Sequence, residues 1–241
     1  MINSRLPDAS VDALHAWAAA GGLRMHSSLA VTRGKGGRAL VATDPIPKGA
    51  ELLRVPYGLL ITSNDAPRAF DDLGQTNRLA VALVMERRQQ RRWAASLALL
   101  PESFDTPLYH TPDQLAWLQG SPLVEWNRGR EQAVRRSLGS IQERWKTSAA
   151  VLSNGAVAEG GASAGVGIDE LRWALSVTWS RSFMVRLQSG APRTASLVPM
   201  GDLINHAEQL LANTASRSEQ GQHAERSPLG GPPRNSPTPL A

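Results

Sequence analysis

We interpret residues 197–206, which read LVPMGDLINH, as the segment around which this chain is organised. An apolar stretch with a proline runs into three polar residues, Asp202, Asn205 and His206. Carboxylate, amide and imidazole groups can hold the polar ends of a bound molecule. In most proteins, however, an isolated DLINH segment is a loop with a capping asparagine. Its role therefore depends on the residues that precede it.

Arg181 and Phe183 lie in WSRSF at 179–183, at the end of a helical pattern. A guanidinium group there can fix a carboxylate at the rim of a pocket. An aromatic wall favours a neutral amine, because an apolar environment disfavours the charged form. Deprotonating a lysine, whose pKa is about 10.4, costs about 4.6 kcal/mol at pH 7, whereas a histidine with a pKa of about 6.5 needs little such help. The alternative for Phe183 is core packing.

Residues 34–42, GKGGRALVA, are the third candidate. On their own they read as a hairpin turn that leads into a strand. They are not a P-loop, because the spacing and the Ser/Thr are missing. Residues 161–165 fit the pattern G-x-S-x-G, but a nucleophile elbow lies between a strand and a helix, and these residues lie in a Gly/Ala-rich linker.

Composition narrows the class of protein. The 241 residues include no cysteine, which excludes a disulfide scaffold and a thiolate zinc site. His15, His26, His110 and His223 show no ligand spacing, so we expect no metal. The sequence contains no apolar run of about 18 residues, so we expect no membrane span. We expect an intracellular protein, with cytoplasm, nucleus and plastid left open.

The net charge of +5 is carried almost entirely by arginine, and its densest cluster is Arg87, Arg88, Arg91 and Arg92. We interpret this cluster as the solvated end of a helix rather than as a polyanion site. Nucleic acid is therefore not an expected partner. A nucleic-acid binder would instead show a steep salt dependence of binding.

The hydrophobic pattern predicts short strands, then a block of helices, then further strands. In the first part we expect a helix over 11–23 and strands at 29–32, 39–43, 51–55 and 59–62. After residue 74 we expect helices over 77–92, from Thr111 with a capping box, over 126–152 and from Asp169 to Phe183, then strands at 184–188 and 196–199. From about residue 211 the chain is rich in Ser, Pro, Gly and Gln, which predicts a disordered tail.

Several segments, taken in order, resemble the SET-domain protein methyltransferases of the branch that includes the Rubisco large-subunit lysine and actin-histidine enzymes. The resemblance rests on GGRALVATDPIPKGAELLRVP at 36–56, LPESFDTPLY at 100–109, LQGSPL at 118–123, SRSF at 180–183 and LVPMGDLINH at 197–206. It implies an α+β protein, namely a β-rich SET fold split by an α-helical insert, with a disordered C-terminal tail. The expected parts are the N-terminal helix and first half of the SET fold at 1–74, the insert with a flexible loop at 75–167, an incomplete second half at 168–210 and the tail at 211–241.

The same resemblance implies S-adenosylmethionine as cofactor. Its methionine end would be lined by Arg38, Ala39, Leu40 and Val41, although the second glycine usual at this strand is Ala39 here. Arg181 would meet both the cofactor carboxylate and the substrate channel. Asn205 and His206 would hold the amino and adenine ends, with Asp202 beside them.

Phe183 then indicates the substrate, because the lysine-modifying relatives have phenylalanine at this place and the histidine-modifying ones a polar amide. We therefore expect a protein substrate that is methylated on a lysine side chain, with histidine methylation as the alternative. A different class of function is a SET-like module that binds a protein partner through the insert without catalysis.

The family's catalytic tyrosine follows the Asn-His pair, but the two tyrosines of this chain, Tyr57 and Tyr109, both precede it. We therefore assign no catalytic residue. We expect a family member truncated at the C-terminus, so that its ancestry and its activity are separate predictions.

Overall fold

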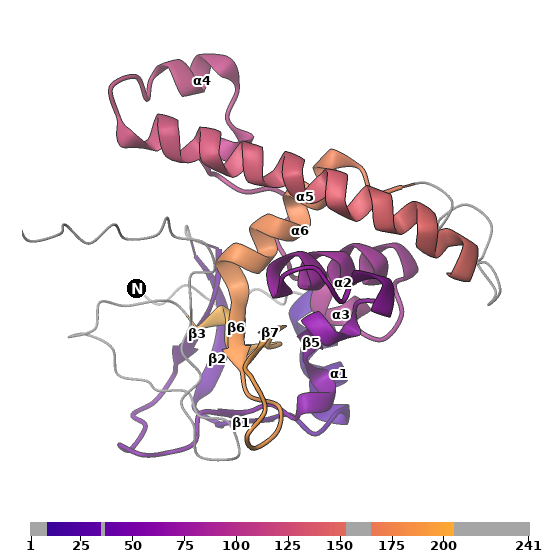
Figure 1. Ribbon diagram of the computed structural model, residues 1–241. Coiled ribbons are helices and arrows are strands. Elements are labelled where there is room, and N and C mark those ends of the chain that lie inside the picture. The colour runs from indigo at the N-terminus through magenta and orange to yellow at the C-terminus, as the bar shows by residue number, and fades with distance from the viewer. Residues whose placement is uncertain (1–8, 35–36, 153–164, 205–241) are drawn as a thin grey trace, which may run out of the picture.

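A computed structural model describes residues 9–34, 37–152 and 165–204 of the chain (Figure 1). Its helices are α1 Ala9–Ala20, α2 Gln75–Gln89, α3 Ala94–Leu97, α4 Pro112–Ala116, α5 Pro122–Leu152 and α6 Ile168–Arg181. Its strands are β1 Arg24–Met25, β2 Leu29–Gly34, β3 Gly37–Ala42, β4 Leu53–Arg54, β5 Ile61–Thr62, β6 Ser182–Val185 and β7 Thr194–Leu197. Short 3-10 turns include η1 Tyr57–Leu59, η2 Ser63–Asp65, η3 Arg68–Phe70, η4 Pro107–Tyr109 and η5 Gly201–Leu203.

The strands form three small antiparallel sheets. β1 pairs with β4, β2 pairs with β3, and β7 lies between β5 and β6. The last sheet joins distant parts of the sequence, since Ile61 of β5 is opposite Leu197 of β7. The expected α+β architecture, with strands on either side of a helical insert, is therefore confirmed.

Helices α2, α5 and α6 form a layer against the strands. In Figure 1, α5 crosses the upper part of the molecule below α4, and α2 and α6 lie between α5 and the strands. α2 is buried on nearly every side, because its apolar run from Leu79 to Val84 contains no polar residue. It contacts α6, and α6 continues directly into β6.

Two hydrophobic clusters hold these layers together. The larger one combines α2, α5 and α6 with Ile61 and Leu197 of the three-stranded sheet. The smaller one combines Leu14 and Ala18 of α1 with Met200 and Leu203 near the end of the described chain. The first and last parts of the described chain thus share the smaller cluster.

Several expected boundaries shift. β4 and β5 are two residues long, residues 57–59 form a 3-10 turn, and α5 begins at Pro122 rather than at residue 126. Asp169 does not cap α6. The N-cap is Gly167, whose N–H donates to Glu170 Oε2 over 3.0 Å.

The capping box of Thr111 with Gln114 is confirmed at the start of α4. α6 ends at Arg181, so that Phe183 belongs to a strand rather than to the helix. Residues 153–164 of the linker predicted at 153–167, with most of the G-x-S-x-G pattern, lie outside the described residues, and so does the tail predicted from residue 211.

Candidate functional site

The change from helix to strand at residues 181–183 places Arg181 and Phe183 next to β7. The N–H and the hydroxyl of Ser182 both donate to the carbonyl of Thr178, the hydroxyl over 2.6 Å, which ends α6 and starts β6. Phe183 then lies opposite Ser196 of β7. Its side chain is half-buried, so both alternatives for Phe183, a pocket wall and core packing, stay predictions.

Arg181 is tied to the turn that follows β7. Its Nη1 donates to Asp202 Oδ2 over 2.9 Å and lies 3.5 Å from the Asp202 carbonyl oxygen. The two side chains are 24% and 14% exposed, so the ion pair is largely shielded from water. The predicted site residues Arg181 and Asp202 are therefore brought together, with one side of the guanidinium group engaged by the carboxylate.

The turn itself is fixed by two residues that the sequence analysis did not single out, Met200 and Gly201. Met200 has a φ of 65° and is fully buried. A Cβ atom on Gly201 would lie 2.9 Å from Cγ1 of Val198, so a side chain at this position would force Val198 to shift. A left-handed, buried non-glycine residue persists only where its surroundings hold it. The signal for this in the sequence was the Met-Gly pair directly before Asp202.

β3 brings the first half of the chain to this turn. Leu40 packs against the cluster that contains Met200 and Leu203, and β3 contacts η5. Ala39 and Val41 alternate with Leu40 along the strand, and Val41 is 36% exposed. In the register of the hairpin, Arg38 is opposite Arg33.

Two of the predicted segments thus reach η5, since β3 contacts it and Arg181 pairs with its Asp202. Phe183 lies opposite Ser196 of β7, the strand that precedes η5. That these residues bind a cofactor or substrate remains a prediction. Asn205 and His206 lie outside the described residues, so their roles remain predictions.

Both tyrosines have structural partners. The Tyr57 hydroxyl donates to the carbonyl of Arg186, just after β6, over 3.1 Å. Tyr109 lies in the insert, where its hydroxyl donates to Ser176 of α6 and burial raises its pKa. Tyr57 therefore supports the β6–β7 hairpin from the first half of the chain, which the sequence pattern did not indicate.

The arginine cluster at the end of α2 is more constrained than a solvated helix end. Arg87 lies over the Trp173 ring, 4.1 Å from its centroid, and Arg88 pairs with Glu170 of α6 at 2.6 Å. Arg92 donates to the carbonyl of Gly58. Three of these four arginines thus connect α2 and the chain after it to neighbouring elements.

Within residues 9–34, 37–152 and 165–204, no group of three or more His, Asp or Glu side chains could hold a metal ion. In the same part of the chain, no helix combines the length and apolar character needed to cross a membrane.

Comparison with known proteins connects this architecture to one group of enzymes. The sequence is 27% identical over 202 residues to the Rubisco large-subunit N-methyltransferase of Nicotiana tabacum, covering 80% of this chain and 37% of the tobacco protein. It is 26% identical over 193 residues to the actin-histidine N-methyltransferase of Xenopus tropicalis, covering 73% of this chain and 31% of that one.

A third relative is the fructose-bisphosphate aldolase-lysine N-methyltransferase of Arabidopsis thaliana, 26% identical over 70% of this chain and 34% of its own. No model of a known protein family matches the sequence. Among solved structures, the SET domain of LSMT bound to methyllysine and AdoHcy superposes with a TM-score of 0.70 at 24% identity, over 85% of this chain and 46% of that one.

This chain is a homologue of these SET-domain methyltransferases. The structural match shows that it has the SET fold, as its segment order predicted. The chain spans about a third of the length of the curated relatives that it matches.

Proposed function

We propose that this SET-domain homologue is an S-adenosylmethionine-dependent protein N-methyltransferase that acts on lysine. The observation that carries the proposal is the convergence of β3, the β6–β7 hairpin and η5 around the Arg181–Asp202 pair. The relatives of this chain include Rubisco large-subunit and actin-histidine N-methyltransferases, and Rubisco LSMT, which has the same fold, binds AdoMet.

The residues present fit the cofactor. Next to Arg38, Gly37 has a φ of 101° and open space where a side chain would stand, so the backbone can approach a ligand there. Val41 offers exposed apolar surface for the hydrocarbon part of the cofactor's methionine end. The guanidinium group of Arg181 still has N–H groups beyond Nη1 that can fix a carboxylate.

When bound, S-adenosylmethionine supplies a methyl group on a positively charged sulfur. The protein's part is to align the acceptor amine with it at about 3–3.5 Å and to exclude water. Phe183 lowers the cost of presenting that amine in its neutral form, because an apolar wall destabilises the ammonium. Asp202 holds the guanidinium group of Arg181 in place through its hydrogen bond with Nη1.

Incubation of the chain with methyl-tritiated cofactor and protein extracts tests this proposal. We expect label on lysine, identified by amino-acid analysis after hydrolysis, and loss of label in Arg181→Ala. Arg172→Ala is the matched control, because it removes an ion pair whose carboxylate, that of Asp169, is exposed to solvent. Label on histidine would support the alternative specificity. An absence of both labelling and ultraviolet crosslinking to the cofactor would contradict the activity and support the non-catalytic alternative.

A further inference from the structure

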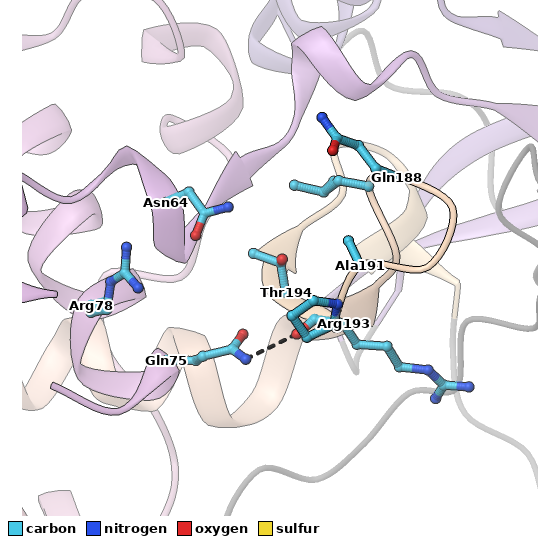
Figure 2. Close-up of a pocket in the computed structure, with 9 residues that line it drawn as sticks. Asn64, Gln75, Arg78, Gln188, Ala191, Arg193 and Thr194 are labelled. Carbon is cyan, nitrogen blue, oxygen red and sulfur yellow. Dashed lines mark hydrogen bonds between the residues drawn. The ribbon is translucent and has the colours of Figure 1, made fainter. Parts of the chain in front are cut away.

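A cavity of about 310 Å³ lies at the turn of the β6–β7 hairpin, at the opposite end of this hairpin from Phe183 (Figure 2). Three elements bound it, namely η2, the start of α2 and the turn between β6 and β7. None of the residues predicted to bind cofactor or substrate lines it. It is therefore a separate candidate site.

The polar groups of this cavity are suited to an anion. Arg78 and Arg193 line it, and its lining contains no acidic residue. The Arg78 side chain is 18% exposed and pairs with Asp71 at 2.9 Å through Nη2, while its Nε has no hydrogen-bond partner in the described structure. Figure 2 shows Asn64 and Arg78 on one side of the cavity, with Thr194 and Ala191 facing them. Arg193 extends away from the centre and adds positive charge at the rim.

The remaining wall is apolar and preformed. Leu187, Ala191 and Pro192 supply hydrocarbon surface. Gln75 fixes the strand behind them, since its Nε2 donates to the Arg193 carbonyl over 2.9 Å and its Oε1 accepts the Ala195 N–H over 2.6 Å. Because its amide is used in this way, Gln75 is part of the wall rather than a group left for a ligand.

We infer that this cavity binds a carboxylate carried on a short apolar chain, such as a small aliphatic acid or a glutamate side chain. A guanidinium group favours a carboxylate, and the hydroxyl of Thr194 and the amide of Asn64 can donate to its oxygens. The volume is at the lower end of the range for ligand pockets, about 300–1,000 Å³, which suits a chain of a few carbons.

Titration of the isotopically labelled chain with butyrate, followed by amide NMR shifts, tests the inference directly. We expect shifts confined to the hairpin turn and the start of α2, with a dissociation constant in the range of about 1–10 mM. Butyramide, which has the same shape without the charge, is the control and should cause much smaller shifts. Equal shifts with both compounds, or none with butyrate, would overturn the inference.

Two variants of one ion pair separate binding from folding. Arg78→Gln should weaken butyrate binding about tenfold or more, because a charge-assisted contact is lost. Asp71→Asn should tighten it several-fold, because the Arg78 charge is no longer neutralised. If Arg78 served only to pair with Asp71, both variants would change binding in the same direction. Thr194→Val, which keeps the side-chain shape, should weaken binding about threefold and provides a readout even if Arg78→Gln does not fold.

Two further peptide probes distinguish a carboxylate on a protein side chain from that of a free acid. An alanine peptide with one glutamate, set against the same peptide with glutamine, tests for an acidic side chain of a protein. Tighter binding of the glutamate peptide than of butyrate supports a protein source, and tighter binding of butyrate supports a free acid. Since no cofactor is present in these titrations, their outcome is independent of the proposed methyl transfer.

Discussion

The Arg181–Asp202 ion pair joins the end of α6 to the turn after β7 at the point where the first half of the chain also arrives. Ion pairs on open surfaces contribute little, because water screens them and ordering two side chains costs entropy. This one is largely shielded, so removing one partner leaves the other charge poorly solvated. In the function proposed above, this pair fixes the guanidinium group that would bind the cofactor carboxylate.

Asp202→Asn should lower the free energy of unfolding by about 1–2 kcal/mol, because Arg181 loses its counter-ion in a shielded place. Urea denaturation followed by circular dichroism measures this loss. Asp169→Asn is the matched control, since it removes a similar pair whose carboxylate is exposed, and it should change stability by less than about 0.5 kcal/mol. Equal losses in the two variants would show that burial does not distinguish these pairs.

Glu170 links pH to the packing of α6 on α2. Its hydrogen bonds with Arg88, the largest cause, and with the N–H of Gly167 hold its pKa below the usual range. A lowered folded-state pKa gives stability that is present above the unfolded value, about 4.3, and is lost as the pH falls through the folded value. Protonation of Glu170 should therefore loosen this contact in acid.

Glu170→Gln should be less stable than the unmodified chain at pH 7, and the gap should narrow as the pH drops below about 4. Urea denaturation at pH 7 and at pH 3.5 measures both differences. Glu125→Gln, at an exposed pair with Arg128, should show no such narrowing. A gap of constant size between Glu170→Gln and the unmodified chain across this range would contradict the role assigned to the carboxylate.

At the scale of elements, the β6–β7 hairpin depends on parts of the chain that lie far from it in sequence. Gln75, at the start of α2, continues the hydrogen bonding of β7 where β5 has ended, and Tyr57 supports the residue after β6. The hairpin that contains Phe183 is therefore held by the helical insert as well as by the first β portion, the strands that precede α2.

Gln75→Leu, which keeps the bulk of the side chain without its hydrogen bonds, should destabilise the chain by about 1–3 kcal/mol, because the Ala195 N–H and the Arg193 carbonyl lose their partners. Hydrogen exchange at the Ala195 amide should become faster, which separates this effect from a general loss of stability. Gln89→Leu, at the exposed end of the same helix, is the control. Unchanged exchange at Ala195 would show that the side chain does not protect this strand.

The elements themselves could largely be predicted from the sequence. The apolar run of α2, the periodicity of α5 and the capping box at Thr111 predicted helices close to those found, because local patterns determine them. The ends of the strands and the start of α6 were predicted less accurately than the helices α2 and α5. Gly167 caps α6 through Glu170, and the lengths of β4 and β5 depend on pairing with remote segments rather than on their own residues.

At the scale of the whole molecule, two hydrophobic clusters place both β portions on one framework across the inserted helices. Met200 and Leu203 pack with α1 and with Leu40 of β3, whereas Leu197 packs with α2 and α6. The segment order indicated this arrangement only through its resemblance to known enzymes. The left-handed Met200 and the pairing of Arg181 with Asp202 required the tertiary structure, because neither follows from local spacing.

Calorimetric titration of the chain with S-adenosylhomocysteine tests most directly whether the two β portions form one cofactor site. We predict 1:1 binding that is lost both in Val41→Glu, from the first portion, and in Asn205→Ala, from the second, while Gln89→Leu binds normally. Binding that survives Val41→Glu, or no binding by the unmodified folded chain, would contradict the shared site.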